Sequence, residues 1–322
     1  MAWLGLVEPG LFHFFRGLRR KGLAFLQVLL PVFMIFAIGF IGQKTLGFDT
    51  KTLSRMALYL LSPVLVFRTF YTNAFSSNHL YIILYTFLLC FALIAFVYLL
   101  SWIKKFTRAE TCGMILAASF MNNGNYGTPV ALLLFGAAGF EYAVVLMVIQ
   151  SLLMGTVGVY YAAKGSPENA GVRTALSAVV KMPILYGAII GLSFQFLSIP
   201  VSSSIMEAVD LVANATVPVI MVILGMQLAK ISIKHAPKEK LAYAIGIKLF
   251  LSPLIAFGLT LLLPVDPMVK QLMIIMAAMP TAANTTMYAL EFNTEPDFVS
   301  SSTLISTLLT IVSLPVMFWI VL

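Results

Sequence analysis

The chain has 322 residues, of which 61% are hydrophobic and only 10% are charged. Soluble globular domains are about half apolar and a quarter charged, so this composition excludes a soluble protein and indicates a polytopic membrane protein. The net charge of +8 is typical of basic loops beside membrane spans, and no basic aromatic patch predicts a nucleic-acid partner. Cys90 and Cys112 lie in apolar runs and are expected to be buried thiols rather than a disulfide.

The N-terminal segment, residues 1–22, is interrupted by Glu8-Pro9 and is too short to cross a bilayer. Its basic residues follow its apolar stretch, unlike those of a secretory signal, so we interpret it as an interfacial segment. Ten apolar segments follow, each close to the roughly twenty residues that a spanning helix needs. They are predicted at residues 23–43, 53–71, 80–103, 110–135, 140–162, 183–199, 204–229, 241–263, 268–290 and 297–321. The sequence therefore predicts an all-α membrane protein with ten transmembrane helices.

Residues 164–182 form the longest interruption and divide the chain into two halves of five spans, 23–163 and 183–322. The run that starts at Leu30 resembles the run that starts at Met182, and both have a proline followed eight residues later by a glycine. Because five is an odd number, the second half must cross the membrane in the opposite sense. This predicts two inverted five-helix repeats with a site near the midplane of the bilayer.

Loop charges predict the orientation of the chain. The odd-numbered loops, which include the connection 164–182, carry thirteen Lys and Arg residues, whereas the even-numbered loops carry only Lys270. Four basic residues near the N-terminus argue the other way but are outnumbered. The positive-inside rule therefore predicts cytoplasmic odd loops and two extracytoplasmic termini in the plasma membrane.

Two polar interruptions of apolar spans are the strongest candidates for a site. Asn122 to Pro129 reads Asn-Asn-Gly-Asn-Tyr-Gly-Thr-Pro, and Pro280 to Asn284 reads Pro-Thr-Ala-Ala-Asn. Inside a bilayer, unwound backbone is tolerated only where protein buries it or where it lines a wet cavity, and paired interruptions point to a transporter's substrate site. The candidate substrate-binding residues are Asn122, Asn123, Gly124, Asn125, Gly127, Pro129, Pro280, Asn284 and Thr285.

Each interruption starts a new half-helix, whose first N–H groups have no partner within the helix and favour an anion. We therefore expect Asn122 and Asn284 to contact a substrate carboxylate. The other interpretation of these side chains, that they only satisfy the broken backbone, stays open.

Polar residues inside the spans are candidates for coupling or gating. Arg68 and Lys248 lie near predicted helix ends, where a long side chain can reach the interface. Asp210 has no such route, and it shares a helix face with Asn214, so we expect it to matter more than Arg68. Interhelical hydrogen bonding is the simpler interpretation of Gln150 and Gln227. The coupling and gating candidates are Asp210, Asn214, Gln150 and Lys248.

Enzymatic motifs are absent from the sequence. The three histidines lie at loops or helix ends, and no zinc-ligand cluster or nucleotide-binding glycine loop occurs. Gly187 and Gly191 form a small-residue packing face and need no functional interpretation. We expect no enzyme activity, no cofactor and no metal site.

The interruptions carry a resemblance to a known family. Asn122 to Pro129 resembles the Asn-x-Gly-x-x-Gly-x-Pro signature of the auxin efflux carrier family, and the segment around Pro280 and Asn284 resembles its other half. Pro218 to Leu228 is similar to the family's Pro-x5-Leu-Gly-x-x-Leu segment. The resemblance runs from about Leu23 to the C-terminus. The chain departs from the family in its N-terminal extension and at Met182-Pro183, where many members have Asn-Pro.

This resemblance implies ten helices in two inverted repeats, with a scaffold from spans 1, 2, 6 and 7 and a mobile domain in which broken spans 4 and 9 cross. It implies a secondary transporter of small organic anions, either auxin-like acids or dicarboxylates of the malate and malonate type. We expect elevator-type alternating access, a homodimer in lipid, and a proton or sodium as a possible coupling ion. Two alternatives stay open: a sodium-coupled symporter like the bile-acid carriers, and a non-transporting membrane sensor or binding subunit.

If the odd-numbered loops are cytoplasmic, a cysteine introduced in place of Lys238 will not react with a membrane-impermeant thiol reagent in intact cells. The same cysteine is expected to react once the cells are permeabilised, because the reagent then reaches the cytoplasmic face. Labelling at this position in intact cells would reverse the predicted orientation.

Overall fold

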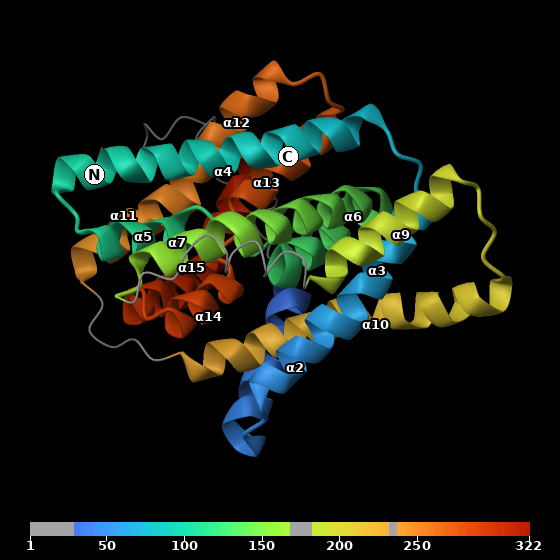
Figure 1. The fold of residues 1–322 in the computed structure, drawn as a ribbon, viewed down its shortest axis with the longest axis horizontal. Coiled ribbons are helices and arrows are strands. Elements are labelled where there is room, and N and C mark those ends of the chain that lie inside the picture. Colours follow the sequence, from blue (N-terminus) through green and yellow to red (C-terminus); the bar gives the residue numbers. More distant parts are fainter. Residues whose placement is uncertain (1–28, 168–181, 232–236) are drawn as a thin grey trace, which may run out of the picture.

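The computed structural model describes residues 29–167, 182–231 and 237–322 (Figure 1). The predicted interfacial segment 1–22 and most of the predicted connection 164–182 lie outside the described residues. Within the described ranges the chain is helical, and its one β-type contact is an isolated bridge between Met121 and Thr281.

The helices of the described ranges follow one another with short connections. In chain order they are Leu29–Leu46, α2 (Thr50–Met56), α3 (Ser62–Thr72), α4 (Ser77–Lys104), α5 (Arg108–Ala118), α6 (Thr128–Leu153), α7 (Val159–Gly165), α9 (Pro183–Phe196), α10 (Ser203–Lys230), α11 (Lys238–Gly246), α12 (Ser252–Leu262), α13 (Pro267–Ala277), α14 (Ala283–Glu291) and α15 (Pro296–Val321). Single π-helical turns precede or join some of them, at Ala57–Leu61, Asn123–Gly127, Met154–Gly158 and Ile247–Leu251.

Seven helical runs of the described part are long and apolar enough to cross a membrane: Leu29–Leu46, Thr50–Thr72, Ser77–Lys104, Asn123–Gly165, Ser203–Lys230, Lys238–Leu262 and Pro296–Val321. The apolar helices α9 and α13 are shorter than a full span. The prediction of an all-helical protein with several membrane spans is confirmed at this level.

Some predicted boundaries differ in detail from the structure. The spans predicted at 110–135 and 140–162 are separated by a kink rather than by a loop, because Gly136 has non-helical φ/ψ between two helical stretches. Gly136 has φ 66°, which a residue without a Cβ adopts readily. The span predicted at 183–199 ends at Phe196, since the left-handed backbone of Ser198, with φ 52°, cannot continue the helix.

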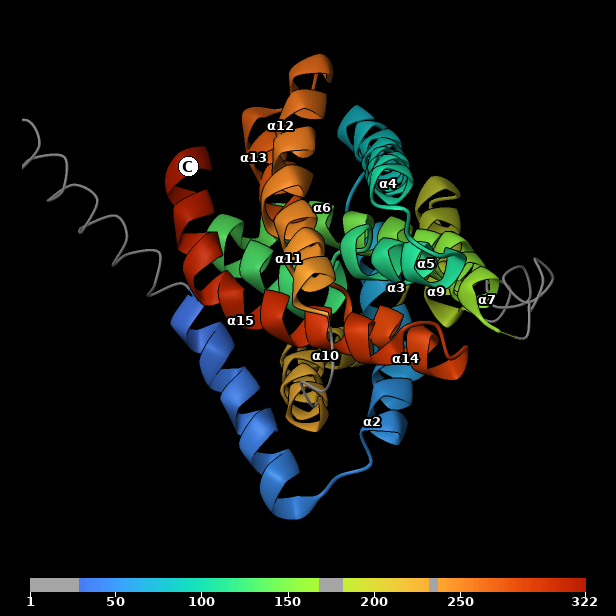
Figure 2. The same ribbon diagram turned by 90° about the vertical axis from the view of Figure 1, so that its left-hand side faces the viewer.

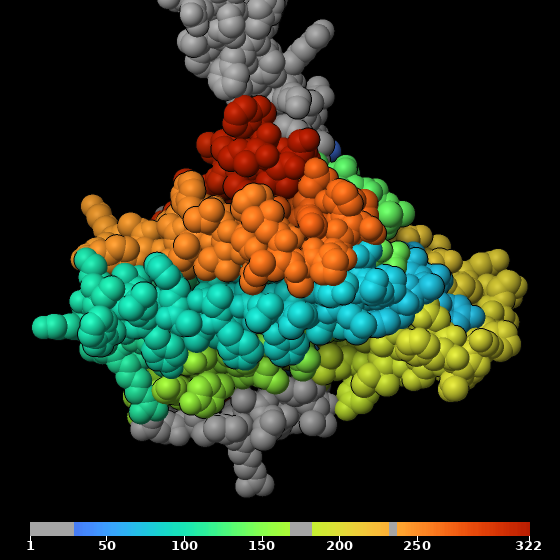
Figure 3. All heavy atoms as spheres, turned by 90° about the horizontal axis from the view of Figure 1, so that it is seen from above, coloured from blue at the N-terminus to red at the C-terminus, as the bar shows by residue number. Residues whose placement is uncertain are grey.

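The helices form two groups. The outer group contains Leu29–Leu46, α2, α3, α9 and α10, and α3 packs against both α9 and α10. The central group contains α4 to α7 and α11 to α15. In Figure 2, α2 and α10 lie low, α4, α12 and α13 lie high, and α5, α6, α14 and α15 lie between them. From above, α4 and α11–α12 lie side by side across the central group (Figure 3).

The central group holds the most deeply buried helix. Every residue of α5 from Thr111 to Ala118 is buried, so this helix has no solvent or lipid face over those two turns. A helix that is covered all round belongs to the interior of a large helical assembly. The polar break that follows α5 therefore lies inside protein.

Prolines explain three of the four π-helical turns. The turns Ala57–Leu61, Asn123–Gly127 and Ile247–Leu251 each end directly before a Ser-Pro or Thr-Pro pair, at Pro63, Pro129 and Pro253. Proline offers no N–H and its ring collides with the carbonyl of the preceding turn, so the turn widens. At one of these turns the hydroxyl before the proline binds the carbonyl that the proline cannot, since Thr128 Oγ1 donates to Gly124 O over 2.6 Å.

Small residues set the spacing within the outer group. A Cβ on Gly187 of α9 would overlap the carbonyl oxygen of Pro63 in α3, and one on Gly191 would lie 2.7 Å from Phe67 O. The packing face predicted at Gly187 and Gly191 is confirmed by this contact.

The N-terminal helix and α10 approach each other in the same way. A Cβ on Gly39 would overlap the carbonyl of Val222, and one on Gly225 would overlap the carbonyl of Phe36. Each of these two helix pairs thus brings backbone against backbone, which fixes the outer group as a closely packed unit.

We expect Gly187→Ala to lower the free energy of unfolding by about 1–3 kcal/mol, because the new methyl group forces α9 away from α3. The matched control is Gly258→Ala in α12, where a Cβ would meet no atom within 4 Å. Thermal unfolding of the two purified variants in detergent measures the difference. An equal unfolding temperature for both would show that the α3–α9 contact is loose.

Candidate functional site

The two polar interruptions meet in the middle of the molecule. The N–H of Asn122 donates to the carbonyl of Pro280 over 2.8 Å, and the N–H of Ala282 donates to the carbonyl of Phe120 over 3.1 Å. These two bonds make a short antiparallel bridge between Met121 and Thr281. The unwound segments thus satisfy part of each other's backbone, which the interior of a bilayer requires.

Hydroxyl side chains bind the C-terminal carbonyls of α5 and α13, the two helices that lead into the crossing. Thr281 Oγ1 donates to the carbonyl of Ala117, in the last turn of α5, over 2.6 Å. Ser252 Oγ donates to the carbonyl of Ala277, the last residue of α13, over 2.8 Å. The last carbonyls of a helix have no partner within it, so these hydroxyls replace bonds that the breaks remove.

Two half-helices begin directly after the crossing. One starts with the π-helical turn Asn123–Gly127, in which the N–H of Gly127 donates to Asn122 O over 2.9 Å, and the other is α14. The first N–H groups of each half-helix, at Asn123 to Asn125 and at Ala283 and Asn284, precede any possible intrahelical acceptor. Both starts therefore offer free donors and the positive end of a helix dipole.

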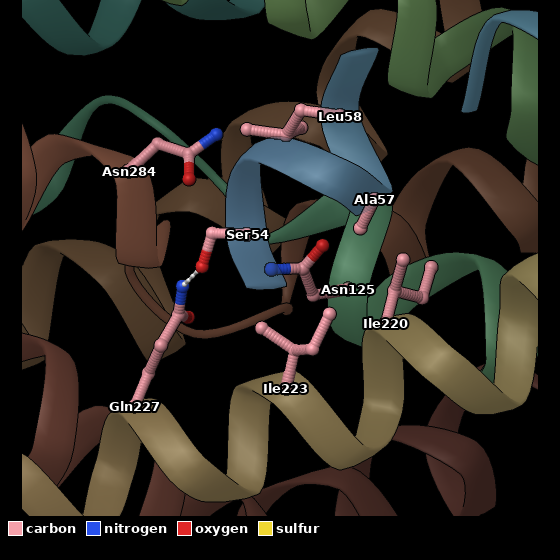
Figure 4. A pocket seen from close by; sticks show the side chains of 8 residues that line it. All are labelled: Ser54, Ala57, Leu58, Asn125, Ile220, Ile223, Gln227 and Asn284. Carbon is pink, nitrogen blue, oxygen red and sulfur yellow. Dashed lines mark hydrogen bonds between the residues drawn. The ribbon is translucent and has the colours of Figure 1, made fainter. Parts of the chain in front are cut away.

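A small cavity lies between these half-helices and the outer group (Figure 4). The amides of Asn125 and Asn284 and the hydroxyl of Ser54 converge on it in Figure 4, each from a different element. Its lining consists of Ser54, Ala57, Leu58, Asn125, Ile220, Ile223, Gln227 and Asn284. The cavity volume is about 10 Å³, which is room for one water molecule. In this conformation the cavity is too small for an organic anion.

The wall of the cavity on the outer side is an antiparallel helix pair. Gln227 Nε2 of α10 donates to Ser54 Oγ of α2 over 2.9 Å at one end of this pair. Further along, Thr216 Oγ1 lies 3.4 Å from Leu61 O. Residue numbers thus rise along α2–α3 while they fall along α10, and the cavity lies at the Ser54 end. The interhelical hydrogen bond expected of Gln227 is confirmed.

The predicted binding residues take two kinds of position. Asn125 and Asn284 line the cavity and are half-buried. The others are not among the lining residues: Asn122, Asn123, Gly127, Pro129, Pro280 and Thr285 are buried and Gly124 is half-buried. Within the described part of the chain, Asn122 Nδ2 and Asn123 Oδ1 have no hydrogen-bond partner. Sequence reasoning did not identify Ser54, since a lone serine in an apolar helix carries no signal.

Arg68 and Asp210 lie beside each other, and Asp210 is the less covered of the two. The side chain of Asp210 is 47% exposed and that of Arg68 only 20%. Arg68 Nη1 lies 3.4 Å from Asp210 Oδ1 and donates to Asn214 Oδ1 over 2.6 Å. The sequence could not show this network, because Arg68 is more than 140 residues away from both Asp210 and Asn214. A coupling or gating role for Asp210 and Asn214 stays a prediction.

The remaining two candidates are buried in the central group. Gln150 is 3% exposed, and its Nε2 has no partner among the described residues. Lys248 is 0% exposed, so the expectation that it reaches the interface was wrong. The π-helical turn Ile247–Leu251 carries its side chain inward, where Cys90 of α4 is close enough to interact electrostatically.

Comparison of the sequence with known proteins places this chain among membrane transporters. The family model described as "Membrane transport protein" matches residues 24–318. An uncharacterised transporter of Methanothermobacter thermautotrophicus is 25% identical over 94% of this chain and 97% of its own length. An uncharacterised transporter of Methanocaldococcus jannaschii is 27% identical over 92% of this chain and 99% of its own length. A protein of Rhizobium meliloti with the name "Putative malonate transporter" is 24% identical over 88% of this chain and 92% of its own length.

We expect Thr281→Val to lower the free energy of unfolding by about 1–3 kcal/mol, because it leaves the buried carbonyl of Ala117 without a donor. Thr86→Val is the matched control, since Thr86 is also buried but donates to Ile82 O within its own helix α4. Thermal unfolding in detergent separates the two. A smaller loss for Thr281→Val than for Thr86→Val would contradict the importance of the crossing bond.

Proposed function

This chain belongs to the auxin efflux carrier family of membrane transport proteins, and we propose that it is a secondary transporter of a small organic carboxylate. The observation that carries the proposal is the cavity on which the starts of two half-helices converge. Asn125 and Asn284 supply one amide each, from the first turn after each break. This is a membrane transporter and not an enzyme.

The chemistry of the cavity favours an anion. Free backbone N–H groups and two aligned helix dipoles stabilise negative charge, as they do at helix N-termini that bind phosphate or carboxylate. The side-chain amides of Asn125, Asn284 and Gln227 can add hydrogen bonds without a full positive charge. Neutral donors suit a carrier, because the substrate must leave the site as readily as it enters.

A dicarboxylate of the malonate type fits the arrangement best. Two half-helix starts face one cavity from the central group, so each can bind one carboxylate of a short diacid. The relative named for malonate supports the same substrate class. Asn122 stays a further candidate for contact, because its Nδ2 lacks a partner among the described residues.

Transport requires the cavity to open. With about 10 Å³ it admits no dicarboxylate, so we propose that the central group moves against the outer group in alternating, elevator-type access. The outer group would be the scaffold, since backbone contacts at Gly39, Gly187 and Gly225 hold its helices together. The central group would carry the crossing and the bound anion.

The order of elements supports the proposal of two inverted repeats with ten spans. In the first half, α5, a break, a half-helix and the bend at Gly136 precede a long helix that ends with α7. In the second half, α13, a break, α14 and a turn with left-handed Asn293 and Glu295 precede the long helix α15. Two extracytoplasmic termini, a plasma-membrane location and a homodimer remain part of the proposal and rest on the sequence.

The test is uptake of labelled malonate by proteoliposomes that contain the purified protein, with and without sodium. We expect saturable uptake that malate competes for and that does not need sodium. A strict requirement for sodium would favour the symporter of the bile-acid type, and no uptake or binding of any carboxylate would favour the sensor.

Asn125→Ala and Asn284→Ala are each expected to weaken malonate binding by about 1–3 kcal/mol, the cost of a lost hydrogen bond to a charged group. Asn122→Ala is measured beside them. Asn73→Ala is the matched control, because Asn73 caps α3 through a hydrogen bond to Thr69 O and does not line the cavity. Binding is measured by calorimetry on folded protein. Unchanged affinity in both cavity variants would move the site elsewhere.

A further inference from the structure

Lys248 is a buried amine that the proposed anion site does not use. Its side chain is 0% exposed, and Nζ has no hydrogen-bond partner among the described residues. A buried ammonium without partners is costly in free energy. Such a lysine in a membrane protein is therefore a candidate for a functional role in binding or transferring a charge.

Two contacts locate Lys248 along the helices of the central group. Lys240, at the start of α11, forms an ion pair with Glu110 at the start of α5. Both helices pack side by side from this point, so Lys248, eight residues further on, lies near the level of Ala118, where α5 ends. Ser252, one turn after Lys248, donates to the carbonyl of Ala277, where α13 ends.

Lys248 is therefore beside the C-terminal ends of the two half-helices whose breaks cross. Those ends carry the negative poles of the helix dipoles, which favour a cation. The opposite poles, at the starts of the next half-helices, face the cavity with Asn125 and Asn284. A positive charge on Lys248 and a negative charge in the cavity would thus lie on opposite sides of one crossing, each at the pole that favours it.

From this arrangement we propose that Lys248 binds and releases the proton that is transported together with the anion. The proposal rests on the proposed function and names its coupling ion. In this cycle the amine carries no added proton before the anion enters. When the anion enters, the nitrogen lone pair takes up a proton from water; after the domain has moved and the anion has left, the same proton returns to water on the other side.

Among the described residues, Cys90 of α4 is the titratable group near enough to act electrostatically on this amine. The remaining titratable groups on the elements that pack around the turn lie nearer the ends of those elements or are engaged elsewhere. They are Tyr85, whose hydroxyl donates to Met273 O, and His79, Tyr81, Tyr98, Lys104, Arg108, Glu110, Cys112, Lys238, Glu239, Lys240, Tyr243, Lys270 and Asp297. Cys90→Ala therefore serves to separate the thiol from the amine.

The experiment measures proton uptake when malonate is added to purified protein in weakly buffered detergent solution with a pH indicator. We expect the wild type to take up about one more proton per bound anion than Lys248→Met. Malonate affinity of the wild type should rise as the pH falls, because protonation and anion binding assist each other. Lys248→Met and the permanently charged Lys248→Arg should bind with a flatter pH profile. Lys238→Met, at an exposed position, and Cys90→Ala should behave like the wild type.

A second measurement needs no ligand. An unfolded chain carries a protonated lysine, so burial of a neutral amine makes the folded state less stable as the pH falls. The unfolding temperature of the wild type should therefore fall more steeply toward acidic pH than that of Lys248→Met or, if this variant does not fold, of Lys248→Gln. Equal slopes, or equal proton uptake by wild type and variant, would overturn the role of Lys248. Absence of malonate binding with unequal slopes would refute the proposed substrate and leave the amine's titration supported.

Discussion

A polypeptide that unwinds inside a bilayer loses its intrahelical hydrogen bonds in a place where no water can replace them. In this molecule each unwound segment supplies the missing partners of the other. The bonds from Asn122 to Pro280 and from Ala282 to Phe120 join segments that are about 160 residues apart in the chain. The rest of the central group is arranged around this requirement. Helix α5 is covered on every side, and hydroxyls from Thr281 and Ser252 bind the carbonyls that the breaks leave open.

The crossing also separates charge. Each break leaves a helix end whose last carbonyls have no partner within the helix and a helix start whose first N–H groups have none. The carbonyl ends favour a cation and the N–H ends favour an anion, at the same depth in the molecule. The starts converge on the cavity with Asn125 and Asn284. The ends lie on the side of Lys248. A protein that moved an anion alone would need only the half-helix starts at the cavity. In the proposed cycle the buried amine of Lys248 gives the helix ends a role in proton binding.

The outer group has a different physical basis. Its helices approach so closely that Gly187 and Gly225 leave no space for a side chain against the neighbouring backbone. Such contacts hold helices together by close packing in a medium where burial of apolar surface gives little advantage. The central group instead meets the outer group at a cavity lined by side chains of moderate size, with Ile220, Ile223 and Leu58 beside the polar groups. A tightly packed unit beside a less tightly packed boundary is suited to relative movement of the two.

Local chemistry is what the sequence determined by itself. Hydropathy predicted helices and membrane spans, and prolines, glycines and asparagines predicted where two helices break, because these effects act within a few residues. The family resemblance, which the match over residues 24–318 confirmed, rests on the same short motifs. Tertiary structure decided which groups meet. It alone placed Asn125, and not Asn122, among the residues that line the cavity, paired Arg68 with Asp210, and buried Lys248 at a position where hydropathy had suggested a route to the interface. The physical reason is that burial and pairing depend on helices from distant parts of the chain. The sequence of one apolar helix does not show which of its faces the neighbouring helices will cover.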